Sequence, residues 1–469
     1  MIRSAASITI VGGGFSGTVT AIQLARGAQP GRVHITLIDS TPAMGGGLAY
    51  RFDDDNLLLN VPAGNMSALA EDPVHFVRYC QKIDPSISVG SFVSRRLYGQ
   101  YLQDTLAHTQ VQYPGVLTTV IGEVRALQRS FDLRRWHIHL TGGQVLPTDQ
   151  VVLAFGHQPP RFPLVLGSDE LPLVSAPWDF DTMHHLPSGK PVLVLGTGHT
   201  AVDALFCLSQ AQPHRPVVMV SRHGLLPQPH RLNPHAPIPH GFPCYLQGVP
   251  SRIRAYLRAF RLHLCTQDAE GFDWRDALNE LRPHTPQLWQ SLPAADQGRF
   301  LRHLQAYWDV HRHRLAPMAA QRLDRLLASG RVHTVAARLV SLQRQGDGLA
   351  VQLCHRGTGQ LQSLHVCAIV NATGPDADAS RATNPLFVQL QRDGLIQPHP
   401  NGLGLCITPE HQVLGAQNQP VDCLWYVGPM LKAQLWEATA VPELRVHARQ
   451  LAQTLLACLN AGTLPKASS

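Results

Sequence analysis

The spacing of apolar positions changes twice within the first forty residues of the chain. Residues 8–11 form a continuous apolar, β-branched run that predicts a buried strand, and a glycine-rich stretch, 12–17, follows directly. Apolar positions then predict a helix over 18–25, and a second apolar run over 33–38 ends at Asp39. This succession of strand, turn, helix and strand predicts a parallel βαβ unit and therefore an α/β fold.

The glycine-rich turn has the spacing of a dinucleotide-binding site. Gly12 permits a tight turn, Gly14 lets backbone approach a pyrophosphate, and Gly17 lets helix and strand pack closely. Asp39 is placed to hydrogen-bond a ribose hydroxyl. A glycine-rich turn without a ligand is the alternative, but the flanking strand, helix and acid favour the nucleotide. We expect cofactor contacts from Gly12, Gly14, Phe15, Ser16, Gly17, Asp39 and Ser40.

The same pattern returns later in the chain. An apolar strand over 191–195 leads into a turn in which Ala201 replaces the last glycine, and a helix over 202–208 and a strand over 217–220 follow. This strand ends in Arg222 instead of an acid. Arginine accommodates a 2′-phosphate, so we expect FAD at the first turn and NADPH at the second. A surface arginine is the alternative for Arg222. The expected contacts are Gly196, Gly198, His199, Thr200, Ser221 and Arg222.

The remaining apolar runs predict further strands and a final helix. A meander is expected over 116–126, 136–140 and 144–146, and later strands over 331–343 and 349–354. Three more apolar runs end in Gly156, Gly374 and Gly428, and a last helix is expected from Trp436 to about residue 459. Further cofactor contacts are expected from Gly47, Leu48, Asn60, Val61, Met66, Val124, Gly156, Gly374, Gly428 and Trp436.

A helical insertion is expected over 224–330, after an entrance rich in proline and histidine. Near its end, His311 and His313 are two residues apart, so they do not share a helix face, and no nearby side chain completes a metal set. We expect no metal, and an anion contact or a solvated helix end remains open for Arg312 and Arg314. The candidate catalytic residues are Arg312, Arg314 and Asn60.

These elements predict two Rossmann-like dinucleotide-binding domains with a helical insertion. The expected FAD-binding domain is formed by residues 1–165 and 366–469, and the NAD(P)-binding domain by 188–223 and 331–365. The insertion occupies 224–330.

Composition narrows the class of protein. The chain has 469 residues, of which 44% are hydrophobic, and no apolar run reaches the ~20 residues that span a membrane. The nine cysteines include no Cys-x-x-Cys pair, and little sequence precedes the first strand, so we expect a cytoplasmic protein without a signal peptide. The net charge is +7, but the arginines are dispersed, which disfavours nucleic acid as a partner.

The chain resembles flavoproteins with two dinucleotide-binding domains. More narrowly, it resembles a bacterial family of FAD/NAD(P)-binding proteins related to the flavin-dependent N-hydroxylating and Baeyer–Villiger (class B) monooxygenases. The resemblance covers nearly the whole chain and rests on both glycine turns and on Gly47 to Tyr50, Leu59 to Pro62, Ser221-Arg222, Asn371 to Gly374 and Trp436-Glu437. The Baeyer–Villiger pattern Phe-x-Gly-x-x-x-His-x-x-x-Trp is not matched, and the redox-active cysteine pair of the disulfide reductases is missing from both turns.

This resemblance implies an FAD-dependent NAD(P)H oxidoreductase. We expect a single-component monooxygenase that uses NADPH and O₂, through a C4a-(hydro)peroxyflavin, to hydroxylate a small metabolite that is acidic or amino-acid-like. The cofactor supplies the oxygen chemistry, which fits the lack of a triad or carboxylate pair. The alternatives are an NAD(P)H:acceptor oxidoreductase without oxygen insertion and a non-enzymatic cofactor-binding protein.

Overall fold

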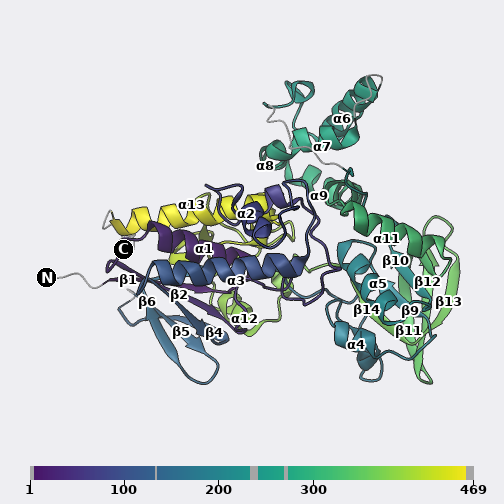
Figure 1. Cartoon of the computed structure of the whole chain (residues 1–469), viewed down its shortest axis with the longest axis horizontal. Coiled ribbons are helices and arrows are strands. Elements are labelled where there is room, and N and C mark those ends of the chain that lie inside the picture. Colours follow the sequence, from purple (N-terminus) through teal and green to yellow (C-terminus); the bar gives the residue numbers. More distant parts are fainter. Residues whose placement is uncertain (1–4, 133–134, 233–240, 269–272, 461–469) are drawn as a thin grey trace. The chain divides into compact units, whose positions relative to one another are not determined.

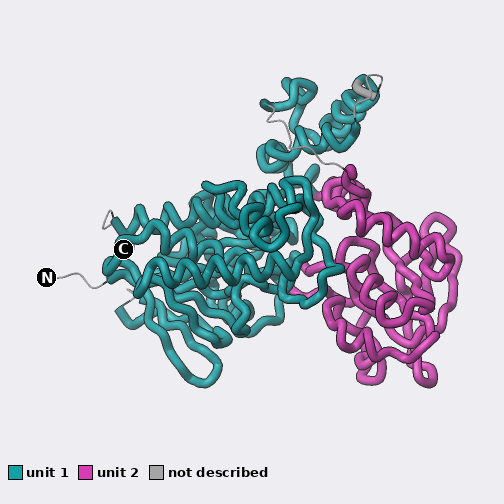
Figure 2. Tube along the Cα trace, in the orientation of Figure 1, with its two compact units in different colours: residues 1–157, 235–297, 377–469 teal, residues 158–234, 298–376 magenta. Residues whose placement is uncertain are grey.

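The structure is a computed structural model that describes residues 5–132, 135–232, 241–268 and 273–460 (Figure 1). The chain forms two compact units, each built from separate segments (Figure 2). Unit 1 comprises Met1–His157, His235–Gln297 and Ala377–Ser469, and unit 2 comprises Gln158–Pro234 and Gly298–Asp376. The expected insertion, 224–330, is divided between the units. The predicted domain boundaries stay a prediction, and part of the proline-rich entrance and the tail beyond Asn460 lie outside the described residues.

Unit 1 is built on a six-stranded sheet with the strand sequence β15-β16-β7-β1-β2-β3. All neighbours in it are parallel except β15 and β16. Its strands are β1 Ala6–Val11, β2 Val33–Asp39, β3 Leu117–Ile121, β7 Gln150–Leu153, β15 Gln412–Leu414 and β16 Pro420–Tyr426. Because helices cover a parallel sheet, its central strands are apolar on both faces, and β7 is buried throughout.

Helices cover one face of this sheet. Helix α1, Phe15–Gly27, is buried along most of its length between α3, Arg95–Gln112, and α13, Val441–Asn460 (Figure 1). The short helix α2, His75–Gln81, packs on α3. Helix α13 begins at Val441 and not at Trp436, where the sequence predicted its start. The α13 start coincides with a proline in the first turn, where a missing N–H costs nothing.

A small antiparallel sheet and one helix complete this part of unit 1. The sheet contains β4 Val124–Arg129, β5 Trp136–Leu140 and β6 Val145–Thr148, and β4 packs against α12, Pro385–Arg392. The prediction of one strand over 116–126 was wrong, because the run is broken at Gly122 into β3 and β4 of different sheets. A Cβ on Gly122 would lie 2.4 Å from Cδ2 of Leu140, so a larger residue there would require the Leu140 side chain to shift.

Unit 2 is built on a seven-stranded sheet with the strand sequence β13-β12-β11-β10-β9-β14-β8. The strands are β8 Val174–Ser175, β9 Val192–Leu195, β10 Val217–Ser221, β11 Val332–Gln345, β12 Gly348–His355, β13 Leu361–Val366 and β14 Ala368–Asn371. Strands β8 to β10 and β14 pair in parallel, as does β11 with β10, whereas β11, β12 and β13 form an antiparallel meander. The helices include α4 Phe180–His184, α5 His199–Ala211 and α11 Pro317–Ala328. The two-Rossmann α/β prediction is confirmed.

The expected insertion is mainly helical, as predicted. Besides α11, its α-helices are α6 Ile253–Asp268, α7 Trp274–Leu281, α8 Thr285–Ser291, α9 Ala294–His303 and α10 Gln305–Arg312. Helices α9 and α10 are separated at Leu304. Among the described residues, none of the helices combines the length and apolar character that a membrane span requires.

Candidate functional site

The first glycine turn joins β1 to α1 and admits no side chain at two of its positions. Gly12 has φ +110°, and a Cβ there would lie 2.7 Å from the carbonyl oxygen of Ala154 at the end of β7. A Cβ at Gly17 would lie 1.9 Å from the carbonyl oxygen of Gly12. Both glycines are therefore required by backbone packing, as the sequence predicted for a tight turn and a close helix.

Gly14 differs, because the protein leaves space beside it. A Cβ on Gly14 would meet only the Cα of Gly47, at 3.7 Å, which is an ordinary contact. The loop that carries Gly47 is fixed on the turn by the Gly45 N–H, which donates to the Gly13 carbonyl at 2.6 Å. Gly14 caps α1 without a side-chain hydrogen bond, and the first helical turn carries no acid. The N–H groups of this helix start are therefore available to an anionic group such as a pyrophosphate.

Asp39 is held at the carboxyl end of β2 beside this turn. Its Oδ2 accepts from the Gly13 N–H at 2.6 Å, and its Oδ1 accepts from both the N–H and the hydroxyl of Thr41, each at 2.9 Å. A carboxylate offers about four acceptor positions, so one remains for a ribose hydroxyl. Ser40 is exposed next to it. The Gly122 N–H donates to the Asp39 carbonyl at 2.8 Å, which brings the buried Val124 to the same strand end.

The predicted strand-end glycines of unit 1 meet at neighbouring strand ends. The Tyr426 hydroxyl donates to the Phe155 carbonyl at 3.1 Å and accepts from the Met430 N–H at 3.0 Å. Burial raises the pKa of Tyr426 far above its usual value, so the hydroxyl keeps its proton. This link places Gly428, with φ +144°, beside Phe155 and hence near Gly156. Because β16, β7 and β1 are adjacent, the carboxyl edge of the sheet carries all three glycine sites.

The loop after Asp39 carries the other predicted contacts of unit 1. Leu48 is 46% exposed, whereas Met66 is buried directly after the 3₁₀ turn Ala63–Asn65. Asn60 and Val61 are half-buried. They follow Leu59, whose N–H donates to the Val93 carbonyl, and they precede that turn. Tyr50 packs edge-on against the Tyr98 ring at 4.7 Å, and burial raises its pKa to about 12. Tyr50 therefore anchors the loop and stays protonated at neutral pH.

The second glycine turn, in unit 2, repeats the backbone geometry of the first. Gly196 has φ +117°, and a Cβ there would lie 2.0 Å from the Ala372 carbonyl oxygen, as Gly12 does with Ala154. Gly198 caps α5 with φ −80° and ψ −170°, against −71° and −169° at Gly14, and a Cβ on it would meet nothing within 4 Å. His199 and Thr200 start the helix. The predicted repeat of the turn is confirmed, with open space at Gly198.

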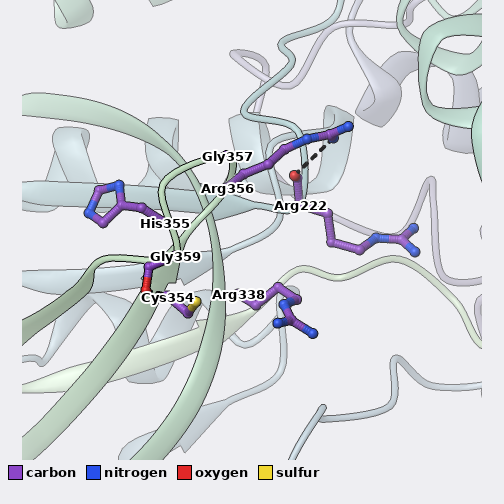
Figure 3. A pocket seen from close by; sticks show the side chains of 7 residues that line it. All are labelled: Arg222, Arg338, Cys354, His355, Arg356, Gly357 and Gly359. Atoms are coloured by element: carbon purple, nitrogen blue, oxygen red, sulfur yellow. Dashed lines mark hydrogen bonds between the residues drawn. The ribbon is translucent and has the colours of Figure 1, made fainter.

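The strand end of β10 lies beside a basic cavity. Ser221 accepts hydrogen bonds from Thr197 and from the Gly224 N–H, each at 2.9 Å, and this fixes the chain around Arg222. Arg222 is exposed and lines a cavity of about 360 Å³ (Figure 3). Arg338 and Arg356 line the same cavity and were missed by sequence reasoning. No local signal could have found them, because they join Arg222 only through the fold. Gly374, with φ +89°, follows β14 in unit 2.

The two candidate catalytic arginines are buried in unit 2. Arg312 is 7% and Arg314 5% exposed, so they do not form the solvated helix end that was left open. The carbonyl oxygen of His313 lies 2.8 Å from Nε2 of His199 at the start of α5. The Leu315 N–H donates to the Gln228 carbonyl at 2.9 Å. The arginine segment therefore lies beside the second glycine turn, and its catalytic role stays a prediction, like that of Asn60.

Trp436 lies at a junction that sequence reasoning did not find. It is buried, and its ring centroid is 4.7 Å from that of Trp289 on α8, whose indole N–H donates to the Ala433 carbonyl at 2.9 Å. The Arg282 guanidinium binds the Glu443 carboxylate in α13 through two hydrogen bonds of 2.8 and 2.9 Å. These contacts fasten residues 282–289 to the start of α13 within unit 1.

Comparison with known proteins identifies the fold of the chain. Residues 9–158 match the sequence model of a family described as FAD-NAD(P)-binding. No curated protein matches the sequence significantly. Among solved structures, the chain is similar to the reduced form of ornithine hydroxylase PvdA from Pseudomonas aeruginosa, with 18% identity over 97% of this chain and 100% of that chain and a TM-score of 0.66.

Two further solved structures show the same likeness. L-lysine 6-monooxygenase from Pseudomonas syringae is 18% identical over 97% of this chain and 99% of that chain, with a TM-score of 0.65. Ornithine N-hydroxylase KtzI from Kutzneria sp. 744, which holds reduced FAD, NADP⁺ and L-ornithine, is 13% identical over 97% and 99%, with a TM-score of 0.63. The chain therefore has the fold of the FAD/NAD(P)-binding N-hydroxylating monooxygenases, and the predicted resemblance is confirmed at the level of the fold.

Proposed function

We propose that the protein is an FAD- and NADPH-dependent oxidoreductase that acts as a single-component monooxygenase on a small metabolite. One observation carries the proposal: the chain contains two glycine turns of the same backbone geometry, one leading to Asp39 and the other to Arg222. An acid at this position favours a free ribose hydroxyl and an arginine favours a 2′-phosphate. The pair of turns thus matches FAD in unit 1 and NADPH in unit 2.

The residues present fit an FAD molecule in unit 1. The space beside Gly14 and the uncapped start of α1 accept a pyrophosphate, and Asp39 accepts a ribose hydroxyl. Bound FAD would accept a hydride from NADPH and, with O₂, supply the oxygen atom that is inserted into a substrate. The protein's own part is to hold the dinucleotides through backbone N–H groups and to exclude water from the reacting edge.

We propose a primary amine of an amino-acid-like molecule as the substrate class. Three solved proteins that are similar over nearly the whole chain are named as hydroxylases or monooxygenases of ornithine or lysine. Arginine side chains bind carboxylates through paired hydrogen bonds. Arg312 and Arg314 are the candidates in this chain for that contact, or for a contact with a nicotinamide cofactor bound at the second glycine turn, beside which their segment lies.

Oxygen coupling tests the proposal. Holoprotein is incubated with NADPH and O₂ and with ornithine or lysine in turn, while NADPH oxidation, peroxide release and product mass are measured. A substrate of the proposed class should lower peroxide release and give a product one oxygen atom heavier for each NADPH consumed. NADPH oxidation that passes to a quinone acceptor with no oxygenated product from any amine would identify an NADPH:acceptor oxidoreductase instead.

A further inference from the structure

The basic cavity of unit 2 is formed by three arginines that come from separate elements. Arg222 follows β10, Arg338 belongs to β11, and Arg356 follows β12. Ser221 pairs with Ala336 across the parallel strands β10 and β11, so Arg338 is two residues beyond the last pair. Figure 3 shows the three guanidinium groups on one side of the lining backbone and the His355 ring on the other.

The backbone keeps these arginines in a fixed relation. The Arg356 guanidinium donates to the Arg222 carbonyl at 3.2 Å, across 134 residues of sequence. A Cβ on Gly224 would approach the Cβ of Ala336 at 3.2 Å, so the chain after Arg222 lies directly against β11. The meander β11 to β13 and the end of β10 therefore form one site within unit 2.

The positive charge of the cavity favours binding of an anion. Its seven lining residues are three arginines, Cys354, His355 and two glycines, and none of them is acidic. Three guanidinium groups around one cavity repel one another unless an anion lies among them. A phosphate monoester suits them, because guanidinium forks bind phosphate oxygens through paired, charge-assisted hydrogen bonds.

The position of the cavity identifies which phosphate. It lies at the carboxyl end of β10, and β10 is next to β9, whose end carries the open Gly198 turn. In a dinucleotide-binding fold, the adenosine ribose reaches the end of this second strand. Side chains at Gly357 and Gly359 would meet nothing within 4 Å, so the rim is open to a ligand.

We propose that this cavity binds the 2′-phosphate of NADPH, and that Arg338 and Arg356 determine the preference for NADPH together with Arg222. The inference rests on the proposed nicotinamide site of unit 2 and extends it to the meander. Preference for NADPH over NADH then depends on three guanidinium groups. The sequence pattern at the end of β10 predicts only one of them, that of Arg222.

Binding of adenosine fragments to the holoprotein tests this inference. Calorimetry with 2′,5′-ADP and with 5′-AMP measures the contribution of the 2′-phosphate without turnover. R338A and R356A should each weaken 2′,5′-ADP by about tenfold, or about 1.4 kcal/mol, and leave 5′-AMP unchanged. R338K should recover part of the affinity. R325A, which removes an exposed arginine on α11 of the same unit, is the matched control and should change neither ligand.

The possible outcomes distinguish failure of the proposed phosphate site from failure of the proposed function. Normal 2′,5′-ADP binding in R338A and R356A, with a loss in R222A, would overturn the role of the meander while the NADPH site stands. Equal affinity of the wild type for 2′,5′-ADP and 5′-AMP would overturn the phosphate site. Failure of the wild type to bind any adenosine fragment or NADPH would overturn the proposed function itself. Unchanged thermal unfolding and FAD content show that the variants are folded.

Discussion

At the scale of single residues, the glycines of the first turn do two different things. Gly17 is required by packing, because a Cβ would overlap the Gly12 carbonyl, whereas Gly14 has space for one. The sequence spacing predicts a separate role for each of the three glycines, and the space around Gly12, Gly14 and Gly17 agrees with those roles. Arg338 and Arg356 could not be predicted at all, because nothing near them in sequence marks a nucleotide site.

The two glycines predict different outcomes for the same substitution. Gly14→Ala should fold, at a capping cost of about 1 kcal/mol, and lose FAD, because the methyl group occupies the space where the pyrophosphate approaches. Gly17→Ala should destabilise the fold by more than ~3 kcal/mol. Thermal unfolding and flavin absorbance after purification measure both effects. A yellow Gly14→Ala protein would show that the pyrophosphate lies elsewhere.

His411 predicts a loss of stability in acid. It is buried at φ +73°, and burial, with a smaller contribution from His447, lowers its pKa to about 4. The unfolded state therefore binds more protons than the folded state between about pH 6.5 and 4, and stability is lost as the pH falls through this window. Lowering the pH from 7 to 5 should cost about 2 kcal/mol at this site.

Denaturant unfolding of His411→Asn tests this assignment. Asparagine tolerates the positive φ and does not titrate, so its free energy of unfolding should fall less between pH 7 and pH 5 than that of the wild type. A pH dependence equal to that of the wild type would show that other groups cause the acid sensitivity.

At the scale of elements, the apolar pattern located most strands and helices but not their ends. It predicted β1, α1 and β2 because burial and propensity agree there. It missed the break at Gly122, whose N–H donates to the Asp39 carbonyl, and the separation of α9 and α10 at Leu304. It also missed β13, whose alternating residues are largely exposed. Tertiary contacts decide these features, and a local pattern does not contain them.

The contacts of Arg282 and Trp289 near the start of α13 predict that these two side chains stabilise residues 282–291. Arg282→Ala should remove two charge-assisted hydrogen bonds to Glu443, and Trp289→Ala should remove a buried ring. Each should increase hydrogen exchange in 282–291, with a loss of about 1.5–3 kcal/mol in local stability for the arginine. Arg258→Ala, at an exposed position on α6, is the control. Unchanged exchange in both variants would rule out this anchor.

At the scale of the whole molecule, two repeats of one nucleotide-binding pattern are distributed over two units. Each unit is assembled from segments far apart in sequence, and residues 224–330 contribute to both. The number and type of the domains follow from the glycine turns, which are local. The division of the helical segment between the units follows from long-range packing and could not be read from the sequence.

Anaerobic reduction of the purified holoprotein tests whether unit 1 binds FAD and unit 2 binds the NADPH that reduces it. Flavin is extracted to identify and count it, and the bound flavin is then mixed with NADPH or NADH in a stopped-flow spectrometer without oxygen. We predict one FAD per chain, bleached by NADPH at much lower concentrations than by NADH. Extraction of FMN, a purified protein without flavin, or a bound FAD that neither nicotinamide cofactor reduces would contradict the assignment of the two dinucleotide sites.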